Sequence, residues 1–337
     1  MTIRMASGTT SAGIMGVGVY RPKRVVTNED VLEHLDSSDE WIRQRSGIVT
    51  RRFANADETV AMMSVAAGER ALARADIDAR QIGAVIVAST TVMRQTPHVA
   101  PEVAFQIGAV GAAAFDVSAG CAGFIHALTI ANDAVRAGSA KYVLVVGVER
   151  FSDITDPEDR GTAFLVGDGA GAMVVGPAKE PGMGPVVWGS DGSQADVLRQ
   201  SMEWSEIREA YESGYPKYRW PGLRMEGRKV FRWASFEMAK AAKQALEMAG
   251  TSVHDLDVFI PHQANIRITE ALTKTLEIPD HVKVAYDITS SGNTGAASVP
   301  LAMERMLVDG EARSGDIALL IGFGAGLSYA ATVTKVP

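Results

Sequence analysis

A single cysteine stands among small residues, in a setting that favours a reactive thiol. Cys121 is the only cysteine of the 337 residues, and it lies within "FDVSAGCAGF" (115–124). A strand-like run precedes it and helical apolar spacing follows it, so the thiol is expected at a helix N-terminus. Unpaired N–H groups and the helix dipole there favour the thiolate and lower the pKa of the thiol. We predict a nucleophile, although a lone cysteine is more often a small buried hydrophobe.

Two further polar side chains stand at the ends of expected elements. His262 follows "LDVFI" and Pro261 at the end of a predicted strand, and Asn293 lies in "SSGNTGAAS", a turn that opens a helix. Singly, a packed core histidine and a turn or capping asparagine are the ordinary interpretations. Together with Cys121 they favour a shared site, because all three fall at corresponding ends of repeated elements.

The repeat is weak but long. "ALARADIDARQIGAVIVAST" from Ala71 resembles "ALEMAGTSVHDLDVFIPHQA" from Ala245, and the segment around Cys121 resembles the one around Asn293. Each half is predicted as strand, helix and strand with buried parallel strands, which is an α/β fold. Two such halves packed face to face would be related by a pseudo-two-fold axis. Cys121 then matches the Gly292–Asn293 pair and His262 matches Ala88, so the three polar groups are expected to meet near that axis.

The repeat also divides the chain into three parts. Residues 1–180 form a half that carries the cysteine, and 227–337 form a half that carries the histidine and asparagine. The polar segment 181–226 between them is predicted as an irregular surface excursion or linker.

Composition limits the possible classes of protein. Hydrophobic residues make up 47% and charged residues 22% of the chain, which is typical of a globular protein. One cysteine excludes an intramolecular disulfide, and the start of the chain lacks the apolar core of a signal peptide. The run "IALLIGFGAGLSYAATV" (317–333) fits two buried strands joined by a glycine-rich turn better than a membrane span. We therefore expect a cytoplasmic protein without a membrane partner.

The net charge of −7 disfavours a nucleic-acid partner. Two basic clusters nevertheless stand out, "IRQRSGIVTRR" and "RMEGRKVFR". Solvated surface charge is their ordinary interpretation, and a landing site for a phosphate-bearing cofactor or an acidic carrier protein is the functional one.

Two other motif interpretations fail on their context. The order and spacing of the cysteine, histidine and asparagine fit a papain-like protease, but the cysteine is far from the N-terminus and lacks that family's surrounding residues. "GDGAGA" (167–172) resembles a dinucleotide loop, but "MVVG" follows it as a strand where a helix is required.

Six segments in order resemble the signature segments of β-ketoacyl-acyl-carrier-protein synthase III, a condensing enzyme of the thiolase superfamily. They are "SSDEWIRQRSGIVTRR", "DVSAGCAGF", "DRGTAFLVGDGAGAMVVG", "PHQANIRI", "GNTGAASVPLAM" and "IGFGAGLSYA". The match runs from about residue 13 to the C-terminus. It implies the duplicated, five-layered αβαβα thiolase fold with pseudo-two-fold symmetry, and a homodimer.

The resemblance also implies roles for individual residues. Cys121 matches the acyl-accepting nucleophile, and His262 and Asn293 match the pair that serves decarboxylation. Further matches are the oxyanion-hole N–H groups of Cys121 and Ala325, the adenine-sandwiching Trp41 and Arg160, the phosphate or carrier-protein contacts Arg45 and Arg267, and the acyl-pocket residues Thr96, which reaches into the partner subunit, and Phe231.

The implied reaction begins fatty-acid synthesis. An acyl-CoA starter acylates the cysteine, malonyl-acyl carrier protein loses carbon dioxide, and the two condense to a β-ketoacyl product without a metal or a tightly bound cofactor. A polyketide or specialised-lipid priming synthase, and an acyltransferase that does not decarboxylate, remain alternatives. Three departures from the family pattern bear on the site: Gly295 stands where serine is usual, Ala325 where glycine is frequent, and Arg94 in a segment expected to be apolar.

Overall fold

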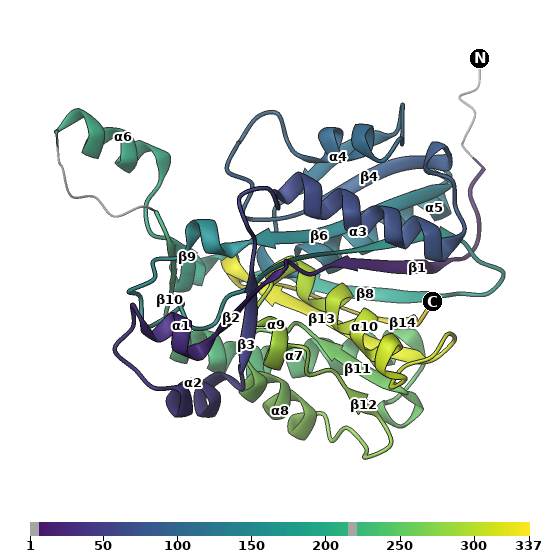
Figure 1. The fold of residues 1–337 in the computed structure, drawn as a ribbon. Coiled ribbons are helices and arrows are strands. Elements are labelled where there is room, and N and C mark those ends of the chain that lie inside the picture. Colours follow the sequence, from purple (N-terminus) through teal and green to yellow (C-terminus); the bar gives the residue numbers. More distant parts are fainter. Residues whose placement is uncertain (1–6, 215–220) are drawn as a thin grey trace.

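Two five-stranded sheets form the framework of the protein (Figure 1). The computed structural model describes residues 7–214 and 221–337. In spatial order the first sheet contains β1 (Ala12–Tyr20), β7 (Asp168–Pro177), β6 (Tyr142–Arg150), β4 (Ile82–Ala88) and β5 (Ala113–Val117). The second contains β8 (Met183–Gly189), β14 (Ser328–Lys335), β13 (Ile317–Gly324), β11 (Val258–Pro261) and β12 (Lys283–Val284).

The two sheets repeat the same topology, which confirms the predicted duplication. In each, the three strands β4, β5 and β6 or β11, β12 and β13 run parallel, and the last two strands pair antiparallel. The run 317–333 forms β13 and most of β14, joined by a turn in which Gly326 has a φ of 70°. A left-handed residue of this kind is readily supplied by glycine.

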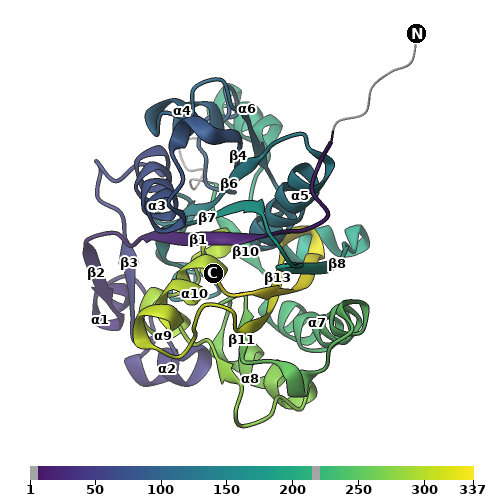
Figure 2. The ribbon, with the colours of Figure 1, turned by 90° about the vertical axis from the view of Figure 1, so that its right-hand side faces the viewer.

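Helices and sheets alternate in five layers (Figures 1 and 2). The outer face of the first sheet is covered by α3 (Val60–Ala75) and α4 (Ala100–Gln106), and that of the second by α7 (Gly227–Ala249) and α8 (Ile266–Thr275). Between the sheets lie α5 (Gly123–Ala137) and α10 (Ser298–Asp309). Side chains alternate along a strand, so Val85 and Val87 of β4 face the outer helices while Ile86 faces the central layer. The fold is the five-layered αβαβα architecture.

Two insertions extend from this framework. The first holds β2 (Arg24–Thr27), α1 (Asn28–Leu32), α2 (Asp39–Ser46) and β3 (Thr50–Phe53), and the short α9 (Ile288–Ser291) packs against β3. The second holds β9 (Leu198–Gln200), α6 (Trp204–Glu212) and β10 (Leu223–Met225), with β9 and β10 paired antiparallel. In Figure 1, α6 projects from the body of the protein.

The second insertion corrects one sequence prediction. Residues 181–226 were expected to be irregular, but Met183–Gly189 forms β8, a full edge strand of the second sheet. The second half of the fold therefore begins at about 183, and only the part after β8 leaves the framework. The prediction failed because β8 lies at a sheet edge, where glycine and proline are tolerated and the apolar run is short. Residues 215–220 of the segment lie outside the described residues.

No helix in the described ranges is both long enough and apolar enough to cross a bilayer.

Candidate active site

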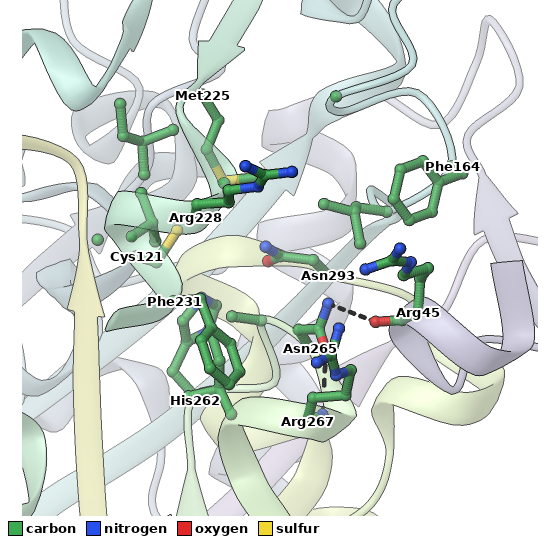
Figure 3. A pocket seen from close by; sticks show the side chains of 18 of the residues that line it. Arg45, Cys121, Phe164, Met225, Arg228, Phe231, His262, Asn265, Arg267 and Asn293 are labelled. Atoms are coloured by element: carbon green, nitrogen blue, oxygen red, sulfur yellow. Dashed lines mark hydrogen bonds between the residues drawn. The ribbon is translucent and has the colours of Figure 1, made fainter. Parts of the chain in front are cut away.

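Cys121, His262 and Asn293 line one pocket, as the repeat predicts (Figure 3). The pocket has a volume of about 680 Å³, and these three residues come from three separate segments. Cys121 lies in a 3₁₀ turn (Gly120–Ala122) between β5 and α5, His262 follows β11, and Asn293 follows α9. Residues far apart in the sequence therefore meet where the two halves of the fold face each other.

The backbone around Cys121 is shaped by glycine. A Cβ on Gly324 would lie 2.6 Å from the Cys121 nitrogen, and a Cβ on Gly120 would lie 2.8 Å from the Ala325 nitrogen. These two N–H groups therefore lie close together, as two donors of an oxyanion hole must. Ala325 itself is not among the described non-glycine residues with positive φ, which are Asp76, Glu277 and Leu327. An alanine is thus accommodated at this position without backbone strain.

The pKa of the Cys121 thiol contradicts the sequence prediction. Burial, and secondarily the negative charge of Glu149, raise the pKa to about 12 instead of lowering it. The regular helix begins only at Gly123, after the 3₁₀ turn, and the half-buried Cys121 lines the pocket. Loss of hydration outweighs the helix N-terminus here. The Cys121 thiol of the resting site is therefore neutral.

His262 is held as a neutral imidazole. Its side chain is almost entirely buried (2% exposed), and burial lowers its pKa to about 3. Its Nδ1 lies 2.7 Å from the Ser298 hydroxyl, and the Phe323 ring meets its ring edge to face at 5.0 Å. Ser298 also accepts the Gln263 N–H, which leaves its hydroxyl hydrogen for Nδ1. This arrangement favours the tautomer with hydrogen on Nε2, the form that can donate to a substrate oxygen.

Asn293 is fixed by contacts from both halves of the fold. Its backbone N–H donates to the Leu165 carbonyl (2.7 Å) and its carbonyl accepts from Gly167 (2.9 Å), in an isolated parallel bridge beside Val166. Its side-chain Oδ1 accepts the N–H of Gly295 at 2.9 Å. Because Oδ1 is held in this way, the Nδ2 amide is the group that Asn293 presents as a donor.

Gly295, the departure from the family pattern beside Asn293, packs closely against the ring of Phe151. It has a φ of 52°, and a Cβ there would lie 2.7 Å from the Phe151 ring and 2.8 Å from Cγ of Glu149. Contacts this short force a displacement of backbone or ring. The glycine therefore does not loosen the turn that aims Asn293: its N–H holds the amide, and Phe151 occupies the space of a larger side chain.

This pairing makes a prediction. Gly295→Ser is expected to reduce condensation by about 10²-fold, the effect of a misplacement of about 1 Å in a catalytic group. Adding Phe151→Leu removes the contact with the ring and is expected to restore part of the rate, because Cγ of Glu149 and the φ of 52° still oppose a side chain there. Steady-state rates of the two single variants and the double variant form the test, since only coupled residues give non-additive effects. A double variant no faster than Gly295→Ser contradicts the pairing.

Aromatic and basic side chains surround the mouth of the pocket. The guanidinium carbons of Arg45 and Arg160 lie 5.7 and 5.9 Å from the centre of the Trp41 ring, and that of Arg267 lies 5.4 Å from the Phe231 ring. All five residues line the pocket. A flat ring inserted between Trp41 and Arg160 needs about 7 Å, two van der Waals separations, so Arg160 must move outward to admit one.

A second cavity meets the first at Cys121 and Asn293. It has a volume of about 280 Å³, and its wall is mainly apolar: Phe151, Ile154, Leu165, Val166, Leu198, Leu223 and Met225. Three of these, Leu198, Leu223 and Met225, come from β9 and β10. Sequence analysis missed them because they lie in the segment predicted as a surface excursion. Their apolar character within "VLRQ" and "GLRM" was the available signal.

The two sequence-predicted acyl-pocket residues do not line the apolar cavity of their own chain, and for Thr96 the prediction concerns the cavity of the partner subunit. Phe231 lines the wider pocket beside Arg267 and not the apolar cavity. Thr96 lies on an exposed loop and lines neither. Arg94, on the same loop, donates to the Pro97 carbonyl and pairs with Glu102 at 3.1 Å, so its charge is satisfied within the loop.

Two further polar residues escaped sequence analysis. Ser298, which bonds His262, lies five residues after Asn293 within a quoted motif, where a hydroxyl at a helix start passes for an ordinary cap. Glu149 ends the apolar run of β6 and is fully buried (0% exposed). A charge at the end of such a strand was the available signal.

The fold and the pocket define a class of protein. A duplicated five-layered fold with a cysteine, a histidine and an asparagine in one pocket is that of a thiolase-superfamily condensing enzyme. Models of 3-oxoacyl-[acyl-carrier-protein] synthase III match residues 115–192, and those of its C-terminal region match 246–336. The chain is 58% identical to β-ketoacyl-[acyl-carrier-protein] synthase III 1 of Streptomyces coelicolor, over 99% of both chains. It belongs to the 3-oxoacyl-[acyl-carrier-protein] synthase III family, the acyltransferases that initiate fatty-acid synthesis by condensation.

Solved structures agree. The priming β-ketosynthase of the R1128 polyketide biosynthetic pathway superposes with a TM-score of 0.96 at 46% identity, over 100% of this chain and 99% of that one. The 3-oxoacyl-[acyl-carrier-protein] synthase III of Aquifex aeolicus superposes with a TM-score of 0.88 at 37% identity, over 96% and 100%. The fold and the enzyme class expected from the sequence are thus confirmed.

Proposed function

We propose that Cys121 carries the acyl group of a decarboxylating condensation between an acyl-CoA starter and malonyl-acyl carrier protein. The observation that supports this most directly is the position of its thiol. Cys121 lies where a cleft rimmed by basic and aromatic side chains meets an apolar cavity, in a pocket shared with neutral His262 and with Asn293. The cleft suits a coenzyme with phosphates and a purine, and the cavity suits an acyl chain.

The first half-reaction loads the enzyme. The Cys121 sulfur attacks the thioester carbonyl, the new carbon–sulfur bond forms, the bond to coenzyme A breaks, and the thiol proton passes to the coenzyme sulfur. The N–H groups of Cys121 and Ala325 stabilise the oxyanion, each by about 2.7–4 kcal/mol in comparable sites. Coenzyme A is a substrate in this scheme, and no tightly bound cofactor or metal is needed.

The second half-reaction forms the carbon–carbon bond. The malonyl group loses carbon dioxide, and the electron pair of the broken bond becomes an enolate. We assign His262 Nε2 and Asn293 Nδ2 as donors to the enolate oxygen, because their other atoms are tied to Ser298 and Gly295. The enolate carbon attacks the acyl carbonyl, and the Cys121 sulfur leaves and regains a proton.

We assign the mouth of the cleft to the coenzyme and the carrier protein. Trp41 and Arg160 would hold the adenine after Arg160 moves outward, and Arg45 and Arg267 would contact phosphates. Basic residues continue along the exposed side of α7 at Lys229, Arg232 and Lys240, which suits an acidic carrier protein.

We further propose a homodimer that works in the cytoplasm. Strand β5 is one of the two edge strands of the first sheet, and Phe115 on it is exposed together with Phe105 and Val110 nearby in the chain. Apolar groups exposed along a sheet edge are typical of a surface that a second copy covers. Thr96 on the neighbouring exposed loop would then reach the partner. A single reduced cysteine fits a reducing compartment.

The size of the apolar cavity bears on which acyl starter the enzyme accepts. A cavity of about 280 Å³ holds several groups the size of a water or methylene, about 30 Å³ each, so short branched or longer acyl chains fit beside acetyl. The similarity to the R1128 priming ketosynthase favours polyketide priming as a second candidate. The two functions share their chemistry and differ in the starter and in the carrier protein.

Intact mass measurement tests the proposal. The protein is incubated with acetyl-, isobutyryl-, isovaleryl- and hexanoyl-CoA in turn, and malonyl-acyl carrier protein is then added. We expect a mass gain of one acyl group, mapped to Cys121, that is discharged as a β-ketoacyl product with release of carbon dioxide. Discharge onto an acceptor without carbon dioxide would instead support the non-decarboxylating acyltransferase. Absence of any adduct with every starter contradicts the proposal.

A further inference from the structure

Glu149 is a buried carboxylate held only by neutral donors in the contacts that the structure describes. It is the penultimate residue of β6, and 0% of its surface is exposed. Thr90 donates to it from both its backbone nitrogen and its hydroxyl, at 3.1–3.2 Å, and the Thr91 hydroxyl donates at 2.8 Å. The backbone N–H of Ala296 is a further donor, and the Ser89 hydroxyl lies at 3.4 Å. Several neutral donors make an anion tolerable in this interior without compensating its charge.

Three segments of the site meet at this carboxylate. Residues 89–91 begin the exposed loop that carries Thr96. On the opposite side, the turn of Gly295 and Ala296, which holds the Asn293 amide, packs against β6. The turn that carries Cys121 packs against this turn of Gly295 and Ala296. On this side, the titratable group that senses the charge of Glu149 is the Cys121 thiol. Residues 89–91 contribute only neutral hydroxyl and backbone donors. The adjacent Arg150 is directed to Asp153.

We propose that Glu149 is a positioning residue that sets the reactivity of Cys121, opposing negative charge on the sulfur when the carboxylate is ionised. A thioester sulfur carries no charge, so an ionised Glu149 disfavours the thiolate relative to the acyl-enzyme. The inference rests on the proposed role of Cys121. The proposal affects the steps in which the Cys121 sulfur takes on negative charge, which are loss of the thiol proton and departure from the acyl carbon.

One consequence of the proposal is that the acyl group is retained on Cys121. In the return reaction a coenzyme thiol would attack the acyl carbonyl and expel Cys121 as a thiolate. A leaving thiol of higher pKa departs more slowly. An ionised Glu149 therefore helps to keep the acyl group on the enzyme until the carbon nucleophile arrives. Protonation of Glu149 removes this effect and eases the departure of the sulfur.

The titration of the carboxylate gives the effect a pH window. Burial raises the pKa of Glu149 to about 7, against hydrogen bonds that lower it. Below this pH the acid is neutral and exerts no charge on the sulfur; above it the carboxylate is ionised and raises the pKa of the thiol. The influence of Glu149 on Cys121 is therefore expected to appear as the pH rises through about 7.

Alkylation of the thiol measures this influence directly. Cys121 is the only cysteine, so iodoacetamide reports on it alone: a carbon–sulfur bond forms, iodide leaves, and the thiol proton goes to the buffer. We expect Glu149→Gln and the unaltered enzyme to react at similar rates at pH 5.5. Above pH 8 the variant should react about tenfold faster, which corresponds to one pKa unit. The rate ratio thus rises with pH.

The matched control is Asp168→Asn. Asp168 is another buried carboxylate with neutral donors, Ser152 and the Ala54 N–H, and burial raises its pKa to about 6. Its rate ratio to the unaltered enzyme should not change with pH. Thr91→Val removes the shortest hydrogen bond to Glu149 and so raises the pH at which the carboxylate ionises. If Glu149→Gln does not fold, this variant is compared with the unaltered enzyme instead, and it should react faster just above pH 7 and at a similar rate at pH 5.5.

Two outcomes overturn the inference. A Glu149→Gln ratio that is constant across pH, whatever its size, assigns Glu149 a purely structural role. A thiol that reacts more slowly in the variant above pH 8 reverses the sign. Neither outcome depends on acylation, because iodoacetamide needs no acyl-CoA site. Failure of the proposed function would appear instead as absence of the acyl adduct with normal alkylation.

Discussion

Cys121→Ala is expected to form no acyl adduct with any acyl-CoA and to lose condensation completely. The sulfur is the only atom of the pocket proposed to bond the acyl carbon, and alanine offers no substitute nucleophile. The variant should still decarboxylate malonyl-carrier protein slowly without condensing it, because His262 and Asn293 keep their contacts with Ser298 and Gly295. Intact mass and release of labelled carbon dioxide measure the two effects separately.

The Cys121→Ala substitution also tests the assignment of roles. Alanine is smaller than cysteine at a half-buried position, so the fold is expected to survive, and the melting temperature checks this. A full acyl adduct on the variant would place the acyl group on another residue and remove Cys121 from its assigned role. If Cys121→Ala loses both the adduct and the release of carbon dioxide, decarboxylation requires the acylated sulfur.

The reciprocal result is expected for His262→Ala. The variant should still accept an acyl group on Cys121 but lose decarboxylation, because one of two donors to the enolate oxygen is gone. Loss of a single oxyanion donor costs about 10²–10³-fold in kcat in comparable sites. The acyl-enzyme should therefore accumulate after malonyl-carrier protein is added. Mass spectrometry over time and carbon dioxide release provide the measurement.

A second histidine serves as the control for His262. His126 lies in α5, where its Nδ1 lies 3.0 Å from the Ala122 carbonyl and its ring stacks on Trp188, and it does not line the pocket. His126→Ala should decarboxylate and condense within a few-fold of the unaltered rate. Normal decarboxylation by His262→Ala would exclude His262 as the donor, whatever its effect on stability.

The sequence is sufficient to predict which segments meet. The repeat placed Cys121, His262 and Asn293 at corresponding ends of elements, and the pocket brings all three together. This succeeds because strand alternation and helix periodicity are local patterns that survive in a single sequence. The same patterns identified the two strands within 317–333, whose glycine-rich connection a membrane span would not need.

The chemical state of the thiol could not be predicted in the same way. The helix N-terminus is a local feature, but the pKa of Cys121 depends on how much water the folded pocket leaves at the sulfur and on Glu149, which comes from another strand. The hydrogen bond from Ser298 to His262 and the packing of Phe151 against Gly295 are likewise contacts between distant segments. Such contacts follow from tertiary packing, which no local pattern encodes.

The apolar cavity illustrates a second limit. Its wall includes Leu198, Leu223 and Met225 from two short strands within a polar segment. Three apolar residues on strands of three residues each are too few to define a period, so composition dominated the prediction. The edge strand β8 was missed because its apolar run is short and is flanked by glycine and proline.

The bridge between Asn293 and residues 165–167 has a consequence for the folding of the enzyme. The backbone of Asn293 is paired with a segment more than a hundred residues earlier in the chain, so its position is undefined until the two halves dock. Contacts of such long range form slowly, because loop closure must precede them. We therefore expect a half-folded chain to contain Cys121 before Asn293 is placed beside it. Catalytic activity is therefore expected to appear only after the two halves have docked.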